Sequence, residues 1–253
     1  MSELSDQRID PAASAFGTAA ADYEVARPSY PPEAIDALRE HAGLAPGRRV
    51  CDLAAGTGKL TRLLAATGAN VIAIEPVPGM REELAAAVPS ADVRDGVAEN
   101  IPLPDGAVDL VTVAQAFHWF RFDEAVVEIH RVLAPGGSIA ILFNERDERT
   151  PWVKSWNDVI EWHTRRIAEY QHTDWTAVLA GGEFGDVAYH RVEWSQPMTR
   201  ELVASRVRSV SYVAQLDEAG QQEYVDRVLP LVGEFDEPFD LPYITHVWTA
   251  SRN

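Results

Sequence analysis

The residues best suited to ligand chemistry lie in a short glycine-rich segment between residues 50 and 60. An apolar strand ends at Asp52, a turn that contains Gly56 and Gly58 follows, and a helix begins near Leu60. Glycines let the backbone turn sharply and approach a ligand closely, and the first turn of a helix offers free N–H groups to that ligand. The segment therefore predicts a ligand site at the carboxyl end of a strand.

Two common nucleotide motifs are absent from this turn. The dinucleotide pattern Gly-x-Gly-x-x-Gly, begun at Gly56, reaches Thr61 where the third glycine is required. No Gly-Lys-Ser/Thr sequence is present, which excludes a phosphate-binding P-loop. The turn thus disfavours a nicotinamide-dependent oxidoreductase.

A second candidate, Glu75, directly follows the apolar segment 71–74. In a parallel sheet the end of this strand lies beside the glycine-rich turn, and an acidic residue there can accept both hydroxyls of a ribose. A solvated carboxylate at a strand end is the alternative. Its spacing from the turn favours the ribose role.

These residues need a scaffold in which strands alternate with helices. Apolar segments predict five strands, at residues 49–53, 70–74, 91–94, 108–113 and 137–143. Helical patterns are found at residues 32–41, 60–67, 79–87 and 123–133. Strands that are apolar almost throughout and alternate with helices indicate a parallel sheet covered on both faces.

The pattern changes after residue 144. Helices are predicted at residues 151–170, 199–210 and 217–231, and two alternating strands at residues 187–194 and 241–249. The expected fold is α/β: a doubly wound, mostly parallel, Rossmann-like seven-stranded sheet with an antiparallel edge strand and helical C-terminal insertions. We expect residues 1–15 to form a flexible arm and residues 16–253 a single domain.

Composition narrows the range of partners. The chain has 39 acidic and 22 basic residues and a formal net charge of −17, a balance that repels phosphate backbones and disfavours nucleic acid. The single cysteine, Cys51, lies in an apolar run, which excludes an intrachain disulfide and a cysteine-based zinc site; no metal is expected. Neither a secretory signal nor a membrane span is recognisable, so a cytoplasmic location is predicted. The sequence does not indicate an oligomeric state.

Taken together, these motifs resemble the class I S-adenosylmethionine-dependent methyltransferases, and more narrowly the small-molecule group that includes trans-aconitate methyltransferases. The resemblance spans roughly residues 16–145. It is carried by the segments 52–58, 75–80, 98–102, 109–111 and 131–137. It implies S-adenosylmethionine as cofactor, bound by about residues 16–145, and an acceptor covered by about residues 146–240.

The resemblance also assigns residues to each part of the cofactor. Those expected to line its amino-acid part are Asp52, Ala54, Ala55, Gly56 and Gly58. Those expected at the ribose and the adenine ring are Glu75, Pro76 and Met80. Those expected to border the adenine amino group are Val97, Ala98 and Glu99. Where this chain has Val97 many relatives carry an aspartate, so backbone groups or Glu99 would contact the amino group.

Two further segments are similar to parts of the family. Tyr23 and Arg27 would form an N-terminal lid over the cofactor carboxylate, which arginine suits through its paired N–H groups; a proline-stiffened surface loop is the alternative. Gln115 and His118 follow the fourth strand, where the transferred methyl should lie, and His118 is the candidate general base. A structural histidine is an equal alternative, and a carboxylate acceptor would need no base.

The aromatic residues after position 150 are expected to cap the acceptor, with packing on the sheet as the alternative. They are Trp152, Trp156, Trp162, His163, Tyr170 and Trp175. The predicted function is methyl transfer to a small molecule, with a carboxylic acid or another metabolite as the leading acceptor. A non-catalytic regulator that binds the cofactor is the competing hypothesis, ahead of the oxidoreductase.

Overall fold

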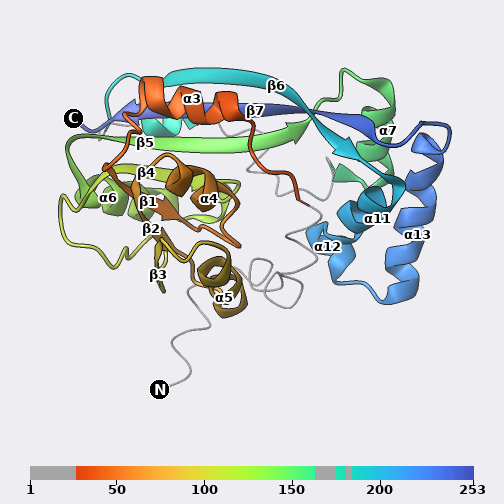
Figure 1. Cartoon of the computed structure of the whole chain (residues 1–253), viewed down its shortest axis with the longest axis horizontal. Coiled ribbons are helices and arrows are strands. Elements are labelled where there is room, and N and C mark those ends of the chain that lie inside the picture. The colour runs from red at the N-terminus through yellow and green to blue at the C-terminus, as the bar shows by residue number, and fades with distance from the viewer. Residues whose placement is uncertain (1–26, 163–174, 181–183) are drawn as a thin grey trace.

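The protein is described by a computed structural model that covers residues 27–162, 175–180 and 184–253. The elements of its first part (Figure 1) are α3 (Pro32–His41), β1 (Arg49–Leu53), α4 (Lys59–Ala66), β2 (Asn70–Ile74), α5 (Pro78–Ala87), β3 (Asp92–Arg94), β4 (Val108–Ala114), the 3₁₀ helix η2 (Phe117–Trp119), α6 (Phe122–Val132) and β5 (Leu133–Arg146). Those of its second part are α7 (Pro151–Val159), α10 (Trp175–Leu179), β6 (Ala188–Met198), α11 (Arg200–Arg208), α12 (Ser211–Ala214), α13 (Glu218–Val228), the 3₁₀ helix η3 (Leu229–Val232) and β7 (Phe239–Ser251). The predicted arm, residues 1–15, lies outside the described residues.

The strands form one seven-stranded sheet in the order β3-β2-β1-β4-β5-β7-β6. Strands β1 to β5 are parallel, whereas β7 runs antiparallel to both β5 and β6. The predicted fold class is therefore confirmed. The strand order reverses between β1 and β4, and ligands of such sheets bind beyond the carboxyl ends of the strands at this switch point.

Both faces of the parallel part are covered, as the apolar strands predicted. Successive strand residues point to opposite faces, so Val50 packs with α3 and α4 in one core while Cys51 packs with α6 in another. Burial also raises the pKa of the Cys51 thiol above its ordinary value, which keeps it protonated and agrees with a core role. Because β1 and β4 contribute residues to both cores, packing on the two faces of the sheet holds these strands in place at the switch point.

The last three strands are longer than the sequence predicted. The apolar pattern gave residues 137–143, 187–194 and 241–249, but β5, β6 and β7 continue past these limits. Polar residues such as Asn144 and Arg146 hide the strand pattern in the sequence, whereas the backbone pairing of β5 with β7 continues to Arg146 and Tyr243. The extension carries the strands beyond the carboxyl ends of β1 and β4.

A helical lobe lies on this extension. Figure 1 shows α7, α11, α12 and α13 gathered at the far ends of β5, β6 and β7, beyond the parallel strands. The lobe has a hydrophobic core of its own, which includes Trp156, Val203 and Val225 together with Leu241 and Tyr243 from β7. The helix predicted at 151–170 is observed as α7, which ends at Val159, and residues 163–174 lie outside the described part. No described helix has the length and apolar character needed to cross a bilayer.

Candidate functional site

Two strained backbone positions mark the switch point. Ala54 directly follows β1 and has φ 56°, and Gln115 directly follows β4 and has φ 59°. A side chain makes this left-handed conformation unfavourable, and such strain concentrates at binding and catalytic sites. Hydrogen bonds to the neighbouring strands hold both turns: the Ala55 N–H donates to the Ile74 carbonyl at 3.1 Å, and the Gln115 N–H to the Leu142 carbonyl at 2.9 Å.

The glycines of the first turn are needed for its shape. Gly56 has φ 59° and Gly58 has φ 87°. A Cβ on Gly58 would come within 2.3 Å of Leu84 Cδ1, so any other residue at position 58 would force the Leu84 side chain of α5 to move. A Cβ on Gly56 would approach Met80 Sδ at 4.0 Å, which places the predicted adenine contact Met80 beside the turn.

Asp52 lies beneath the turn rather than on its surface. Its side chain is only 1% exposed, and its carboxylate accepts hydrogen bonds from Thr61 Oγ1 at 2.6 Å and Thr112 Oγ1 at 2.9 Å. Burial raises the pKa of Asp52 to about 6, although the two threonine hydrogen bonds oppose that change. Asp52 thus joins β1, α4 and β4 and gives the base of the turn a negative charge near neutral pH.

Glu75 holds the turn from the side of β2. Its Oε2 accepts a hydrogen bond from the Gly56 N–H and its Oε1 one from the Val77 N–H, both at 2.9 Å. The residue is 4% exposed, and burial raises the pKa of its carboxyl while these N–H donors hold it down. A carboxylate oxygen can accept more than one hydrogen bond, so both oxygens keep acceptor capacity for the two hydroxyls of a ribose.

The segment predicted to border an adenine ring follows β3. Val97 and Ala98 are buried, and the isolated bridge between Val97 and Asn100 closes a tight turn. Glu99 accepts a hydrogen bond from the Arg121 N–H at 2.8 Å, an interaction the sequence did not predict. Pro76 is half-buried, and its carbonyl accepts from Arg81 Nη1 at 2.7 Å.

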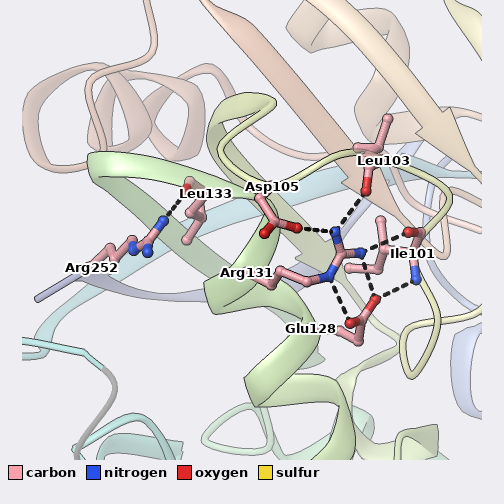
Figure 2. Close-up of polar contacts among 7 residues, drawn as sticks. All are labelled: Ile101, Leu103, Asp105, Glu128, Arg131, Leu133 and Arg252. Carbon is pink, nitrogen blue, oxygen red and sulfur yellow. Dashed lines mark hydrogen bonds and ion pairs between the residues drawn. The ribbon is translucent and has the colours of Figure 1, made fainter.

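A polar network around Arg131 fixes the far end of the same connection. Figure 2 shows the Arg131 guanidinium, on α6, donating to the Leu103 and Ile101 carbonyls at 2.8 and 3.0 Å. It also pairs with Glu128 at 2.8 Å and Asp105 at 2.9 Å. Since one rigid, many-donor group clamps residues 101–105 to α6, the preceding residues 97–99 are held in place beside the switch point.

The aromatic segment after β4 divides between core and site. Phe117 is fully buried and packs edge-to-face on Trp175 at 5.2 Å, so both rings belong to the core below the sheet. His118 is half-buried, with its ring 4.7 Å from that of Trp119 and 5.8 Å from that of Phe143. Gln115 Nε2 donates to the Asn144 carbonyl at 3.2 Å. Gln115 and His118 therefore lie on the connection that leaves the switch point.

The predicted lid is only partly visible. Tyr23 lies outside the described residues, as do His163 and Tyr170 of the predicted cap. The Arg27 guanidinium donates to the Ser209 carbonyl at 2.7 Å, so this residue contacts the helical lobe. Trp156 lies in the core of the lobe, and Trp152 and Trp162 pack against that core, whereas Trp175 packs beneath the sheet. The four tryptophans of the predicted cap that the structure describes are thus divided between two cores.

Comparison with known proteins adds the family. A family described as "Methyltransferase domain" matches residues 51–141, which include the turn, Glu75 and the segment after β4. The chain is 39% identical over 235 residues to an uncharacterized methyltransferase of Mycobacterium tuberculosis, covering 91% of this chain and 92% of that one. It is 36% identical over 170 residues, 62% of each chain, to the malonyl-[acyl-carrier protein] O-methyltransferase of Methylococcus capsulatus.

A solved structure with the same fold contains the expected cofactor. It is phosphoethanolamine N-methyltransferase 2 of Haemonchus contortus in complex with S-adenosyl-L-methionine, which aligns with a TM-score of 0.55 at 13% identity. The alignment covers 93% of the present chain and 57% of that one.

Proposed function

Because the chain belongs to the class I S-adenosylmethionine-dependent methyltransferases, we propose that it transfers the methyl group to a small-molecule acceptor. The observation that carries the proposal is the buried carboxylate of Glu75, which holds the strained turn at the switch point and keeps acceptor capacity on both oxygens. A carboxylate in this position can accept the two hydroxyls of a ribose, and the negative charge also suits the cationic sulfonium attached to that ribose.

The residues around the turn suit the proposed binding mode. Ala54, Ala55 and Gly56 leave room for a backbone-lined cradle, and Asp52 supplies negative charge at its base. Glu75 would accept from the ribose, and Pro76 and Met80 would lie against adenine, whose amino group would face Val97, Ala98 and Glu99. In this scheme residues 16–145 hold the cofactor and residues 146–240 cover the acceptor, all within one domain.

The chain's own contribution to the reaction is alignment and exclusion of water. The bound cofactor supplies an activated methyl group on a positively charged sulfur. Rigid turns at Ala54 and Gln115 would fix the site, and correct placement of two reactants can lower a barrier by about 7–11 kcal/mol. His118 would accept a proton if the acceptor group is protonated at neutral pH.

One relative supports an acceptor that carries an acid. The Methylococcus capsulatus relative is named for O-methylation of malonyl-[acyl-carrier protein], and a malonyl group ends in a carboxylate. With a net charge of −17 the chain is a poor match for nucleic acid, which supports a metabolite instead. A cytoplasmic location is part of the same proposal.

Three binding measurements and one turnover measurement test the function. We expect calorimetry to detect binding of S-adenosylmethionine and of its demethylated product, S-adenosylhomocysteine, and to detect no binding of NAD. We also expect labelled methyl groups to appear in a component of a metabolite extract incubated with the enzyme. Binding of NAD would favour the oxidoreductase, and cofactor binding without any transfer would favour a regulator.

A further inference from the structure

The extended end of β5 places an arginine beyond the glycine-rich turn that follows β1. Leu142 pairs with Ala114 at the carboxyl end of β4, and Arg146 lies four residues farther along β5, opposite Tyr243 of β7. At a rise of ~3.3 Å per residue this is roughly 13 Å past the end of β4. Arg146 is the last residue of β5, and Figure 1 shows this end of the strand pointing toward the helical lobe.

Arg146 is buried, and none of the acidic residues that the structure describes pairs with its guanidinium. It is 7% exposed, and its Nε donates to Asn157 Oδ1 at 2.6 Å. Its guanidinium carbon lies 4.8 Å from the Trp162 ring and 5.4 Å from the Trp156 ring. Among the described residues, neither Nη1 nor Nη2 finds a hydrogen-bond acceptor. One edge of the group is thus fixed, and the other is left with unsatisfied donors.

Other buried donors surround it. Arg206, on α11, is 5% exposed; its Nη1 donates to Ser209 Oγ at 3.3 Å, but its Nε has no acceptor in the described structure. The same holds for Trp156 Nε1 and the Tyr243 hydroxyl, both in fully buried side chains. We call Arg146, Arg206, Trp156 and Tyr243 the buried donor cluster. Apart from the tyrosine oxygen, every unsatisfied atom in it is an obligate donor.

The positive charges around Arg146 also favour a bound anion. Burial, and then the positive charge of Arg206, lower the pKa of Arg146 to about 9, with a further contribution from Arg27. Arg146 thus stays protonated at neutral pH. Two buried guanidinium groups near each other are unfavourable unless an anion compensates their charge. The largest electrostatic effects on the pKa of Arg146 come from Arg206, Tyr243, Arg27 and Tyr212.

We propose that the buried donor cluster binds a carboxylate of the methyl acceptor, which makes the acceptor an organic anion; this rests on the proposed function. The free Nη1 and Nη2 edge of Arg146 matches a planar carboxylate, which accepts two parallel hydrogen bonds. Trp156 and Trp162 flank the guanidinium and exclude water. The cluster is built from β5, β7, α7 and α11, so the lobe contributes directly to acceptor recognition.

The methyl group is not transferred to the anchored carboxylate, because carboxylate oxygens that are paired with guanidinium groups are poor nucleophiles. A second group of the acceptor forms the new bond to the methyl carbon while the carbon–sulfur bond breaks and its electron pair stays on sulfur. A second carboxylate would react without losing a proton. A hydroxyl or amine would pass its proton to a base, for which His118 is placed.

The test uses Arg206→Met with Arg208→Met as its matched control. Arg208 lies on the same helix but is exposed and donates to Gln222 Oε1. Calorimetry on the full chain loaded with S-adenosylhomocysteine would measure succinate, its diamide and inorganic phosphate up to about 10 mM. We expect wild type and Arg208→Met to bind succinate at least about tenfold more tightly than the diamide, and Arg206→Met to lose that preference.

Thermal unfolding gives an independent readout. Because Arg206→Met removes a buried charge that pairs with no acid in the described part of the chain, we expect the ligand-free variant to melt about 2–4 °C higher than wild type. A residue with a merely structural role would lower the melting temperature. Tyr243→Phe is a second variant for the case in which Arg206→Met does not fold. It removes only the hydroxyl and keeps the ring stacked on Trp194 at 5.3 Å, and we expect it to weaken succinate binding.

Other outcomes overturn the proposal. No succinate binding to wild type, or equal binding to Arg206→Met, removes the carboxylate site. Binding of phosphate in preference to succinate assigns the cluster to another anion. A loss of S-adenosylhomocysteine affinity in Arg206→Met would mean that the cluster holds the cofactor's own carboxylate. Failure of wild type to bind S-adenosylhomocysteine is a different result, since it refutes the proposed function itself.

Discussion

Replacement of Glu75 by glutamine tests the central contact of the proposed cofactor site. Both carboxylate oxygens accept backbone N–H groups, from Gly56 and Val77 at 2.9 Å. A glutamine keeps one acceptor oxygen and presents an NH₂ group where the second oxygen stood, so two donors face each other. Hydrogen bonds to a charged group contribute about 1.5–3 kcal/mol.

We therefore expect Glu75→Gln to weaken S-adenosylhomocysteine binding about 10- to 100-fold, since about 1.4 kcal/mol corresponds to a factor of ten. Calorimetry would measure the affinity, and circular dichroism would establish that the variant is folded. Glu82→Gln is the matched control, because Glu82 is exposed on the neighbouring helix α5. A folded Glu75→Gln protein whose affinity stays within about threefold of wild type would refute the assignment of Glu75 to the ribose.

Three further predictions follow from the same region. Asp52 has a folded-state pKa of about 6 against an ordinary value of 3.8, so the folded state binds the proton of this carboxyl more tightly than the unfolded state does. As the pH falls from about 7 to 4, the free energy of unfolding of wild type should therefore rise by up to about 3 kcal/mol relative to Asp52→Asn. The same pH dependence of urea unfolding in both proteins would contradict this prediction. His118→Ala should lower turnover at least about tenfold with little change in cofactor affinity, and wild-type kinetics with the acceptor would exclude His118 as the base. Gly58→Ala should destabilise the fold by about 2–4 kcal/mol in urea, because the added Cβ would lie 2.3 Å from Leu84 Cδ1 and φ is 87°; unchanged stability would show that α5 can shift away.

The sequence was sufficient to predict the parallel half of the fold. Apolar strands alternating with amphipathic helices leave few alternatives, and the glycine-rich turn together with Glu75 predicts where a ligand binds at the strand ends. The seven strands and the antiparallel addition at the edge were also predicted, whereas the order of the strands came from the structure. The sites near the turn, such as Glu75, could be located because strand ends in a parallel sheet meet at one edge.

The other half of the candidate site could not be predicted in the same way. Arg146 follows Asn144 and Glu145, so nothing in the local pattern marks it as a strand residue, and its burial depends on the distant α7 and α11. Arg206 reads as one of several polar residues on a surface helix. Contacts between elements far apart in the chain create the buried donor cluster, and hydrophobic periodicity carries no information on such contacts.

The lobe and the parallel sheet have separate hydrophobic cores, connected through the long strands β5, β6 and β7. Under the proposed function, the side chains that choose the acceptor can therefore be exchanged in the lobe while the packing beneath the glycine-rich turn stays as it is. The proposed arrangement would let one methyl-donor site serve different acceptors through replacement of a peripheral unit. A library with substitutions confined to α7, α11 and the far ends of these strands would be a rational starting point for redirecting the enzyme to new substrates.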